Sequence, residues 1–172
     1  MQRIGRRVDP KYPAIPPRTP AYPLYYAVVK RLIPLFVLLV GGCSTADDSI
    51  PVACRDAGET LPGALAKAPG EVRIDGARIS QCLSEDAESS EVQEVGAAFL
   101  QTASGLAEVA VERPEGEEAV RLGYLVGAAR RGTEGTQGIH YEMVRRLEQE
   151  AGPLAKRSRA YARGRRAGAR SG

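Results

Sequence analysis

Side chains that can act as a general base or a nucleophile are few in this chain of 172 residues. His140 is its only histidine, so a Ser-His-Asp or Cys-His mechanism would depend on that one side chain. No serine lies in a G-x-S-x-G segment, and HYEMV, which begins at His140, lacks the second histidine of the zinc motif H-E-x-x-H. We therefore predict no catalytic residue and no metal site, and we expect no cofactor.

Carboxylates are plentiful, and paired carboxylates can perform acid–base chemistry. Glu117 is adjacent to Glu118, and Glu148 lies two residues before Glu150. These spacings are typical of a helix face in water. A hydrolase that uses His140 with carboxylates distant in the sequence is the alternative to a protein that acts by binding.

The segment from Gly123 to Arg146, which is punctuated by glycines, contains the side chains best suited to bind a ligand. Arg130 and Arg131 precede a turn, and backbone N–H groups at residues 136–138 begin the next helix, so the two together can hold an anion. The alternative is structural, because arginines at a helix C-terminus also offset the helix dipole. The candidate binding surface comprises Tyr124, Arg130, Arg131, His140 and Tyr141.

The first cysteine stands at the end of an apolar segment. Residues 32–40 are apolar apart from Pro34, and Lys30 and Arg31 precede them directly. A basic end followed by a short apolar core is the composition of an export signal. The core is about ten residues long, whereas a membrane-spanning helix needs about twenty. An export signal therefore fits this segment better than a permanent span.

The signal ends in Val40, Gly41, Gly42 and Cys43. These residues resemble the lipobox of bacterial lipoproteins, in which an aliphatic and two small residues precede an invariant cysteine. The resemblance implies that the Cys43 thiol receives a diacylglyceryl group and that a peptidase cuts between Gly42 and Cys43. Cys43 would then begin a mature protein that carries fatty-acyl chains such as palmitate. At roughly 0.8 kcal/mol per buried methylene, two or more chains hold a protein firmly at a membrane.

Residues 1–27 are long and proline-rich for the leading part of such a signal. A translation start at Leu24, Val28 or Val29 would give a signal of ordinary length. A polyproline recognition segment is the alternative. In either case we assign residues 1–42 to the leader and signal.

Two further cysteines, Cys54 and Cys82, remain once Cys43 is acylated. Cysteines in an exported domain usually pair, so we predict a Cys54–Cys82 disulfide. Closing a loop of about thirty residues stabilises a domain by roughly 3–4 kcal/mol in the chain-entropy description. A reactive thiol or a metal site is the alternative, but the pair lacks C-x-x-C spacing and a nearby histidine.

Charge is strongly segregated along the chain. The net charge is +6 over residues 1–31, −10 over residues 43–152 and +7 over residues 153–172. Removal of residues 1–42 leaves 130 residues, which is enough for one small domain. We predict a linker at 43–53, an acidic and mostly helical domain at 54–152, and a basic, disordered tail at 153–172.

The first part of the domain contains signals for a short helix and a β-hairpin. The segment LPGALAKAPG predicts one or two helical turns that end at Pro69 and Gly70. Asp75 and Gly76 favour a two-residue turn in which both residues have positive φ. The predicted register pairs Val72 with Ile79, Ile74 with Ala77, and Arg73 with Arg78.

Two amphipathic helices follow, with apolar residues at spacings of three and four. The first begins near Ser89, with Ser90 and Gln93 as a capping box, and stops at Pro114. The second ends near Gly132. The apolar positions are Val92, Val95, Phe99, Ala103, Leu106 and Val109 in the first helix, and Ala119, Leu122, Val126 and Ala129 in the second.

A third helix begins after Thr136, which is its predicted cap, and ends at Gly152. Its apolar side carries Ile139, Met143 and Leu147. Short connections favour a mainly α fold, a small three-helix up-and-down bundle preceded by the disulfide-closed segment and its hairpin.

Gly123 and Gly127 lie four residues apart on the second helix. This spacing lets another helix approach closely, either within the bundle or at an oligomer face, and we favour the bundle.

These patterns predict an exported protein of the cell envelope, held at the membrane by a lipid anchor, with a non-catalytic role in binding or in supporting a complex. An unidentified envelope protein is one expected partner. The basic tail is expected to bind anionic lipid or an acidic wall polymer, and nucleic acid is not expected because of the export signal. The alternatives are the hydrolase that uses His140 and a carrier with an apolar cavity for a small ligand.

Overall fold

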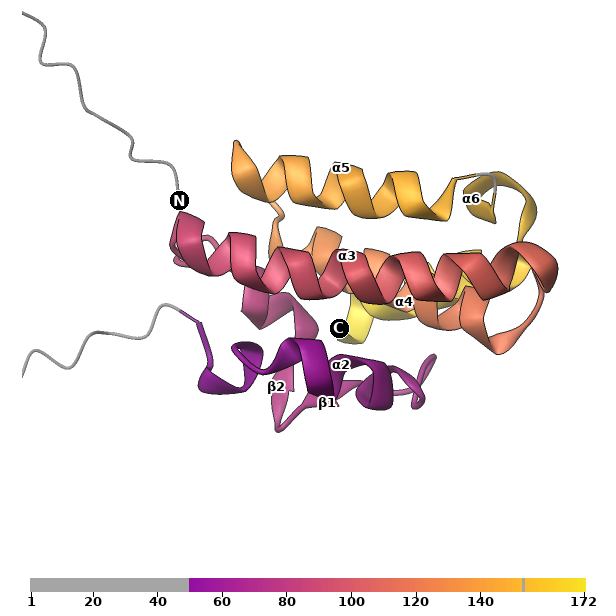
Figure 1. Ribbon diagram of the computed structural model, residues 1–172, viewed down its shortest axis with the longest axis horizontal. Helices are drawn as coiled ribbons and strands as arrows, with labels where there is room; N and C mark the ends of the chain where they lie inside the picture. The colour runs from indigo at the N-terminus through magenta and orange to yellow at the C-terminus, as the bar shows by residue number, and fades with distance from the viewer. Residues whose placement is uncertain (1–49, 153) are drawn as a thin grey trace, which may run out of the picture. The chain divides into compact units, whose positions relative to one another are not determined.

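The computed structural model describes residues 50–152 and 154–172. The predictions for the leader, the signal and Cys43 lie outside these residues. The elements are η2 (Val52–Cys54), α2 (Ala57–Leu65), β1 (Arg73–Ile74), β2 (Ala77–Arg78), η3 (Ile79–Leu83), α3 (Ser89–Glu112), α4 (Glu117–Gly132), α5 (Ile139–Ala151), α6 (Leu154–Arg157) and α7 (Arg159–Ser171), shown in Figure 1.

Helices α3, α4 and α5 form the predicted up-and-down bundle, and each runs opposite to the one before it (Figure 1). Val92, Val95 and Phe99 of the predicted α3 stripe are buried. Towards the C-terminal end of α3 the buried positions are alanines, Ala107 and Ala110, rather than the predicted Leu106 and Val109, which are partly exposed.

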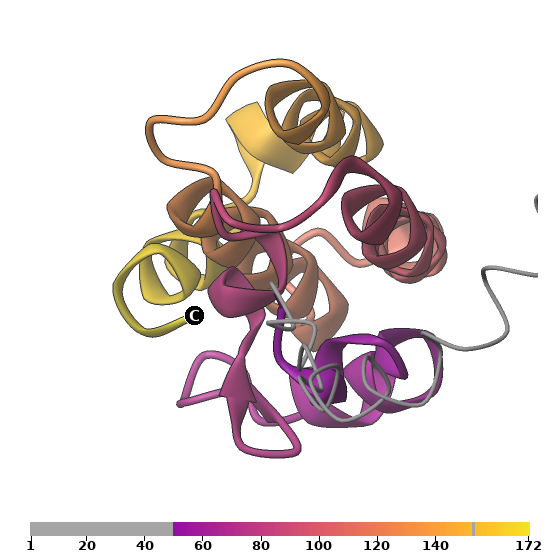
Figure 2. The same ribbon diagram turned by 90° about the vertical axis from the view of Figure 1, so that its left-hand side faces the viewer.

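Helix α4 lies at the centre of the fold. Helices α3, α5 and α7 and the turn η3 all pack against it, and Figure 2 shows α3 and α7 on opposite sides of it. Residues 119–129 are consequently all buried except Arg121. The sequence predicted one apolar stripe on this helix, but its alanines and glycines let neighbours approach from every side.

The prediction of a disordered tail is wrong. Residues Arg159–Ser171 form a fourth long helix, α7, which belongs to the domain. Helix α7 buries Ala160, Tyr161, Gly164, Ala167 and Gly168, and it packs against α4 more extensively than any other pair of elements. The predicted domain boundary after Gly152 is therefore also wrong. The sequence of the tail contains few large apolar side chains, and for this reason we expected no packing. The surface that α7 buries consists mainly of backbone and small residues.

Four glycines make the contact between α4 and α7 possible. A Cβ atom added at Gly123 or Gly127 of α4 would overlap a backbone carbonyl oxygen of α7, and one added at Gly164 or Gly168 of α7 would overlap a carbonyl oxygen of α4. Gly123 and Gly127 thus serve the predicted close approach of another helix within the domain, but that helix is α7, which lay outside the predicted three-helix bundle.

The N-terminus of α7 is fixed by two side chains. The Ser158 hydroxyl oxygen accepts a hydrogen bond from the Tyr161 N–H at 2.8 Å. The Glu115 carboxylate, in the connection between α3 and α4, accepts hydrogen bonds from the N–H groups of Arg159 at 2.9 Å and Ala160 at 3.1 Å. These bonds satisfy backbone donors that have no partner within the helix.

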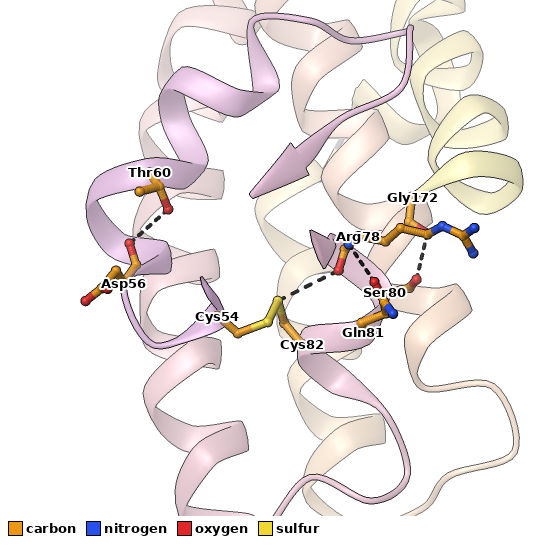
Figure 3. The surroundings of a disulfide bond; sticks show 8 residues. All are labelled: Cys54, Asp56, Thr60, Arg78, Ser80, Gln81, Cys82 and Gly172. Atoms are coloured by element: carbon orange, nitrogen blue, oxygen red, sulfur yellow. Dashed lines mark hydrogen bonds between the residues drawn. A yellow bond between two sulfur atoms is a disulfide. The ribbon is translucent and has the colours of Figure 1, made fainter. Parts of the chain in front are cut away.

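The Cys54–Cys82 disulfide is present, with the two Cα atoms 5.4 Å apart and both side chains fully buried (Figure 3). The hairpin has the predicted register for its two paired positions, and Asp75 and Gly76 have φ angles of 43° and 91° as the turn requires. The Ser80 hydroxyl donates a hydrogen bond to the carbonyl oxygen of Gly172 at 2.6 Å, which ties the segment after the hairpin to α7.

Several predicted boundaries need correction. Helix α2 starts at Ala57, before the predicted segment, and the linker cannot extend to residue 53 because Ile50 lies in the core. The capping box of α3 uses Glu88 and Glu91. Thr136 does not cap α5, because its hydroxyl donates to the Thr133 carbonyl oxygen at 2.8 Å.

Among the described residues, we find no helix with the length and apolar character needed to cross a bilayer.

Candidate functional site

A groove lined by arginines lies at the junction of α4, α5, α7 and the loop that follows α4, and we call it the arginine groove. Its volume is about 580 Å³, within the range of small-molecule sites. Its charged residues are Arg130 and Arg131 from α4, Glu134 from the loop, Arg145 and Glu148 from α5, and Arg165 and Arg166 from α7.

Small residues leave space between the arginine side chains. Gly127 of α4 and Ala169 of α7 line the arginine groove where the two helices meet. The α4–α7 contact depends on glycines, so the backbones come close and the flanking side chains of Arg130 and Arg165 are brought to one opening.

Three of the five arginines have partners within the chain. Arg130 Nη1 donates to Glu148 Oε1 at 2.8 Å, and Arg145 donates through Nε and Nη2 to the two oxygens of Glu142, each at 2.8 Å. Arg131 Nη1 donates to the carbonyl oxygen of Arg170. These contacts hold guanidinium groups in place before any ligand arrives, which lowers the entropy lost on binding.

The other two, Arg165 and Arg166, form no ion pair with any residue that the structure describes. A guanidinium stays charged at every physiological pH and presents donors in a planar fork. With five arginines against two glutamates, the arginine groove carries excess positive charge and attracts anions.

Three side chains at or near the groove have shifted pKa values, and for Arg145 the hydrogen bond to Glu142 raises the pKa. Hydrogen bonds from Arg145 and then Arg146 lower the pKa of Glu142 to about 2. Burial raises the pKa of Tyr161 to about 12, while the charges of Arg165, Glu148 and Arg130 act on it more weakly. At neutral pH the Tyr161 phenol is therefore uncharged, and Glu142 keeps its negative charge.

The structure brings three of the five predicted binding residues together. Arg130, Arg131 and Tyr141 all line the arginine groove, and Tyr141 has 66% of its surface exposed. Thr136, from the turn where we predicted N–H donors, also lines it, whereas Gly138 does not.

Tyr124 and His140 do not line the groove. Tyr124 is fully buried, so the prediction that it belongs to a binding surface is wrong. Its hydroxyl oxygen accepts the Val72 N–H at 3.2 Å and lies 3.2 Å from Ser171 Oγ, which makes it a core link between the hairpin, α4 and α7. His140 is 9% exposed, and its Nε2 atom is buried without a hydrogen-bond partner among the described residues.

Sequence reasoning missed Arg145, Arg165 and Arg166. The last two were assigned to a disordered tail, and Arg145 was not singled out. One signal was available, because Gly164 and Gly168 repeat the four-residue spacing of Gly123 and Gly127. Matching the two pairs would have placed α7 on α4 and the tail arginines beside Arg130.

The groove's chemistry is that of anion recognition. In the described part of the chain, no group of three or more His, Cys, Asp or Glu residues is placed to hold a metal ion. Glu148 accepts a hydrogen bond from Arg130, so this carboxylate helps to position an arginine. The arrangement can hold a phosphate or carboxylate through several charged donors.

A scan against protein-family models, a search of the curated proteins and a search of the solved structures each found no match to this chain.

Proposed function

We propose that this chain is an exported lipoprotein of the cell envelope, anchored to the membrane through acylated Cys43, and that its helical domain acts without catalysis by binding an anionic ligand in the arginine groove. The observation that most supports anion binding is the convergence of five arginines from three helices on one groove.

Two features support the export of the chain. The first is the signal-like sequence that ends at Cys43, with its resemblance to the lipobox. The second is the Cys54–Cys82 disulfide, because structural disulfides persist in oxidising compartments outside the cytosol.

The expected ligand carries phosphate or carboxylate groups, because a guanidinium matches both with paired hydrogen bonds. An acidic segment of an envelope protein or a small phosphorylated molecule has this chemistry. The alternative carrier function called for an apolar cavity, whereas this groove is lined by charged side chains. The alternative hydrolase would need His140, which does not line the groove.

Inorganic pyrophosphate is a suitable probe for the groove. The full chain, labelled with ¹⁵N and held in neutral-lipid nanodiscs, would be titrated while its amide signals are recorded. We expect saturable shifts in residues 131–136 and in α7 near Arg165. Replacing Arg165 and Arg166 by glutamine should weaken binding at least about tenfold, because hydrogen bonds to charged groups contribute about 1.5–3 kcal/mol each.

The matched control changes the same number of charges elsewhere. Arg73→Gln with Arg78→Gln, both on the hairpin, should leave the affinity within a factor of about two, since these residues do not line the groove. Shifts that never saturate, or equal weakening by both double variants, would contradict anion binding in the groove.

A further inference from the structure

The outward side of α7 is a continuous basic surface, which we call the α7 basic face. Arg159, Arg163, Arg166 and Arg170 follow one another at spacings of four, three and four, so they lie along one side of the helix. All four are exposed, and no acidic residue occurs between residues 154 and 171.

The orientation of the α7 basic face is fixed by packing. The opposite side of α7 is buried against α4 through Ala160, Gly164, Ala167 and Gly168. Glu115 and Ser158 hold the N-terminus of the helix. The helix cannot turn its arginines toward the acidic residues of the domain without losing these contacts, so the face stays directed outward.

Within residues 50–152 and 154–172, no arginine side chain of this face forms an ion pair with an acidic residue. The ion pairs of residues 50–152 and 154–172 are formed by arginines outside α7, such as Arg121 with Glu117 at 2.7 Å and Arg130 with Glu148 at 2.8 Å. Like charges three or four residues apart on a helix repel one another. An external anionic surface would relieve this repulsion.

The opposite side of the domain has the opposite charge. Helix α3 carries four glutamates and no basic residue, and it lies across α4 from α7 (Figure 2). The glutamates are Glu91, Glu94, Glu108 and Glu112. The domain is therefore a charge dipole, and a negatively charged plane would attract α7 and repel α3.

We propose that the α7 basic face docks on the anionic phospholipid surface of the membrane that holds the anchor, with α3 directed away from it. This inference rests on the proposed lipid anchor at Cys43. The anchor keeps the domain at a high effective concentration near the bilayer, so each arginine needs only weak attraction to lipid phosphates. Arg166 belongs to both surfaces, so docking sets the arginine groove beside the headgroup layer. The attraction acts over about one Debye length, about 8 Å at physiological salt.

Nanodiscs that contain lipids with nitroxide-labelled headgroups test this arrangement on the full chain. The nitroxide broadens amide signals that lie near the membrane surface. In nanodiscs rich in phosphatidylglycerol, we expect the α7 amides to lose most of their intensity and the α3 amides to keep most of theirs. In neutral nanodiscs, or at high salt, α7 should lose no more intensity than α3.

Two triple variants distinguish the effect of the α7 basic face from the effect of the domain's net charge. Arg159→Gln, Arg163→Gln and Arg170→Gln should abolish the extra broadening of α7 and leave the groove-lining arginines in place. The matched control, Lys67→Gln, Arg73→Gln and Arg78→Gln, removes equal charge from the disulfide-linked segment and should preserve it.

Each outcome is decisive. If the chain stays bound to both kinds of nanodisc but the α7 amide signals are never broadened more than those of α3, the docking proposal is wrong and the proposal of a lipid anchor is retained. If the chain leaves both kinds of nanodisc, the anchor and the docking fail together. If added poly(glycerol phosphate) shifts the α7 signals while anionic nanodiscs leave them unchanged, the face binds a wall polymer and the lipid assignment is wrong.

Discussion

Substituting alanine for Gly164 tests the packing that creates both the arginine groove and the α7 basic face. An added methyl group would overlap the carbonyl oxygen of Val120 on α4. That oxygen belongs to the backbone of the central helix and cannot rotate aside. The two helices must therefore move apart, or α7 must detach.

Two opposing contributions set the size of the effect. Alanine favours a helix over glycine by about 1 kcal/mol. Overpacking a well-packed contact costs about 1–3 kcal/mol, and occasionally more when the obstacle is rigid. Since the obstacle here is backbone, we place the overpacking cost at the upper end, about 3 kcal/mol, and we expect Gly164→Ala to lower the free energy of unfolding by about 2 kcal/mol. The reciprocal Gly123→Ala should act similarly, and the double variant should lose less than the sum because α7 is released only once.

Gly105 of α3 provides the matched control. It lies inside a helix, and a Cβ atom there would meet nothing within 4 Å. Gly105→Ala should therefore raise stability by about 0.5–1 kcal/mol. Urea unfolding followed by circular dichroism measures both changes. If Gly164→Ala raised the midpoint as Gly105→Ala does, α7 would not pack closely on α4 and the groove would not exist as described.

Three further predictions concern covalent and ionisable groups. Replacing Cys54 and Cys82 by serine should lower the free energy of unfolding by about 3–4 kcal/mol for a sequence separation of 28, and mass spectrometry without reductant should show the two joined. The Tyr161 pKa is raised to about 12 by burial, so stability should fall as pH rises from about 10 to 12, and Tyr161→Phe should remove this fall in denaturation curves. The Glu142 pKa is lowered to about 2 by Arg145, so its stabilisation is lost as pH falls from about 4.5 through 2; a carboxyl titration midpoint above 4 by NMR would contradict the contact.

Local patterns predicted much of the fold. The Asp75-Gly76 turn specified the hairpin register because both positions need positive φ, and the spacing of Val92, Val95 and Phe99 located α3. The cysteine count gave the disulfide, since only one pairing was open once Cys43 was set aside.

The sequence analysis missed α7 because hydropathy measures only the apolar character of side chains and does not register close contact between two backbones. The buried side of α7 is mostly alanine and glycine, so its packing depends on the fit of two backbones. The groove was therefore only half predicted: Arg130, Arg131 and Tyr141 were found, whereas Arg165 and Arg166 needed α7 to be in place. Tyr124 was misassigned because its partners, Val72 and Ser171, lie 52 and 47 residues away.

The lipid anchor is the claim on which membrane attachment depends, and an alkyne-tagged fatty acid tests it directly. Bacteria expressing the full chain would be grown with the probe, and the protein would be purified and examined for label. We expect label on the wild-type chain and on the control Ser44→Ala, and no label on Cys43→Ser. An unlabelled wild-type chain, or full labelling of Cys43→Ser, would contradict the anchor.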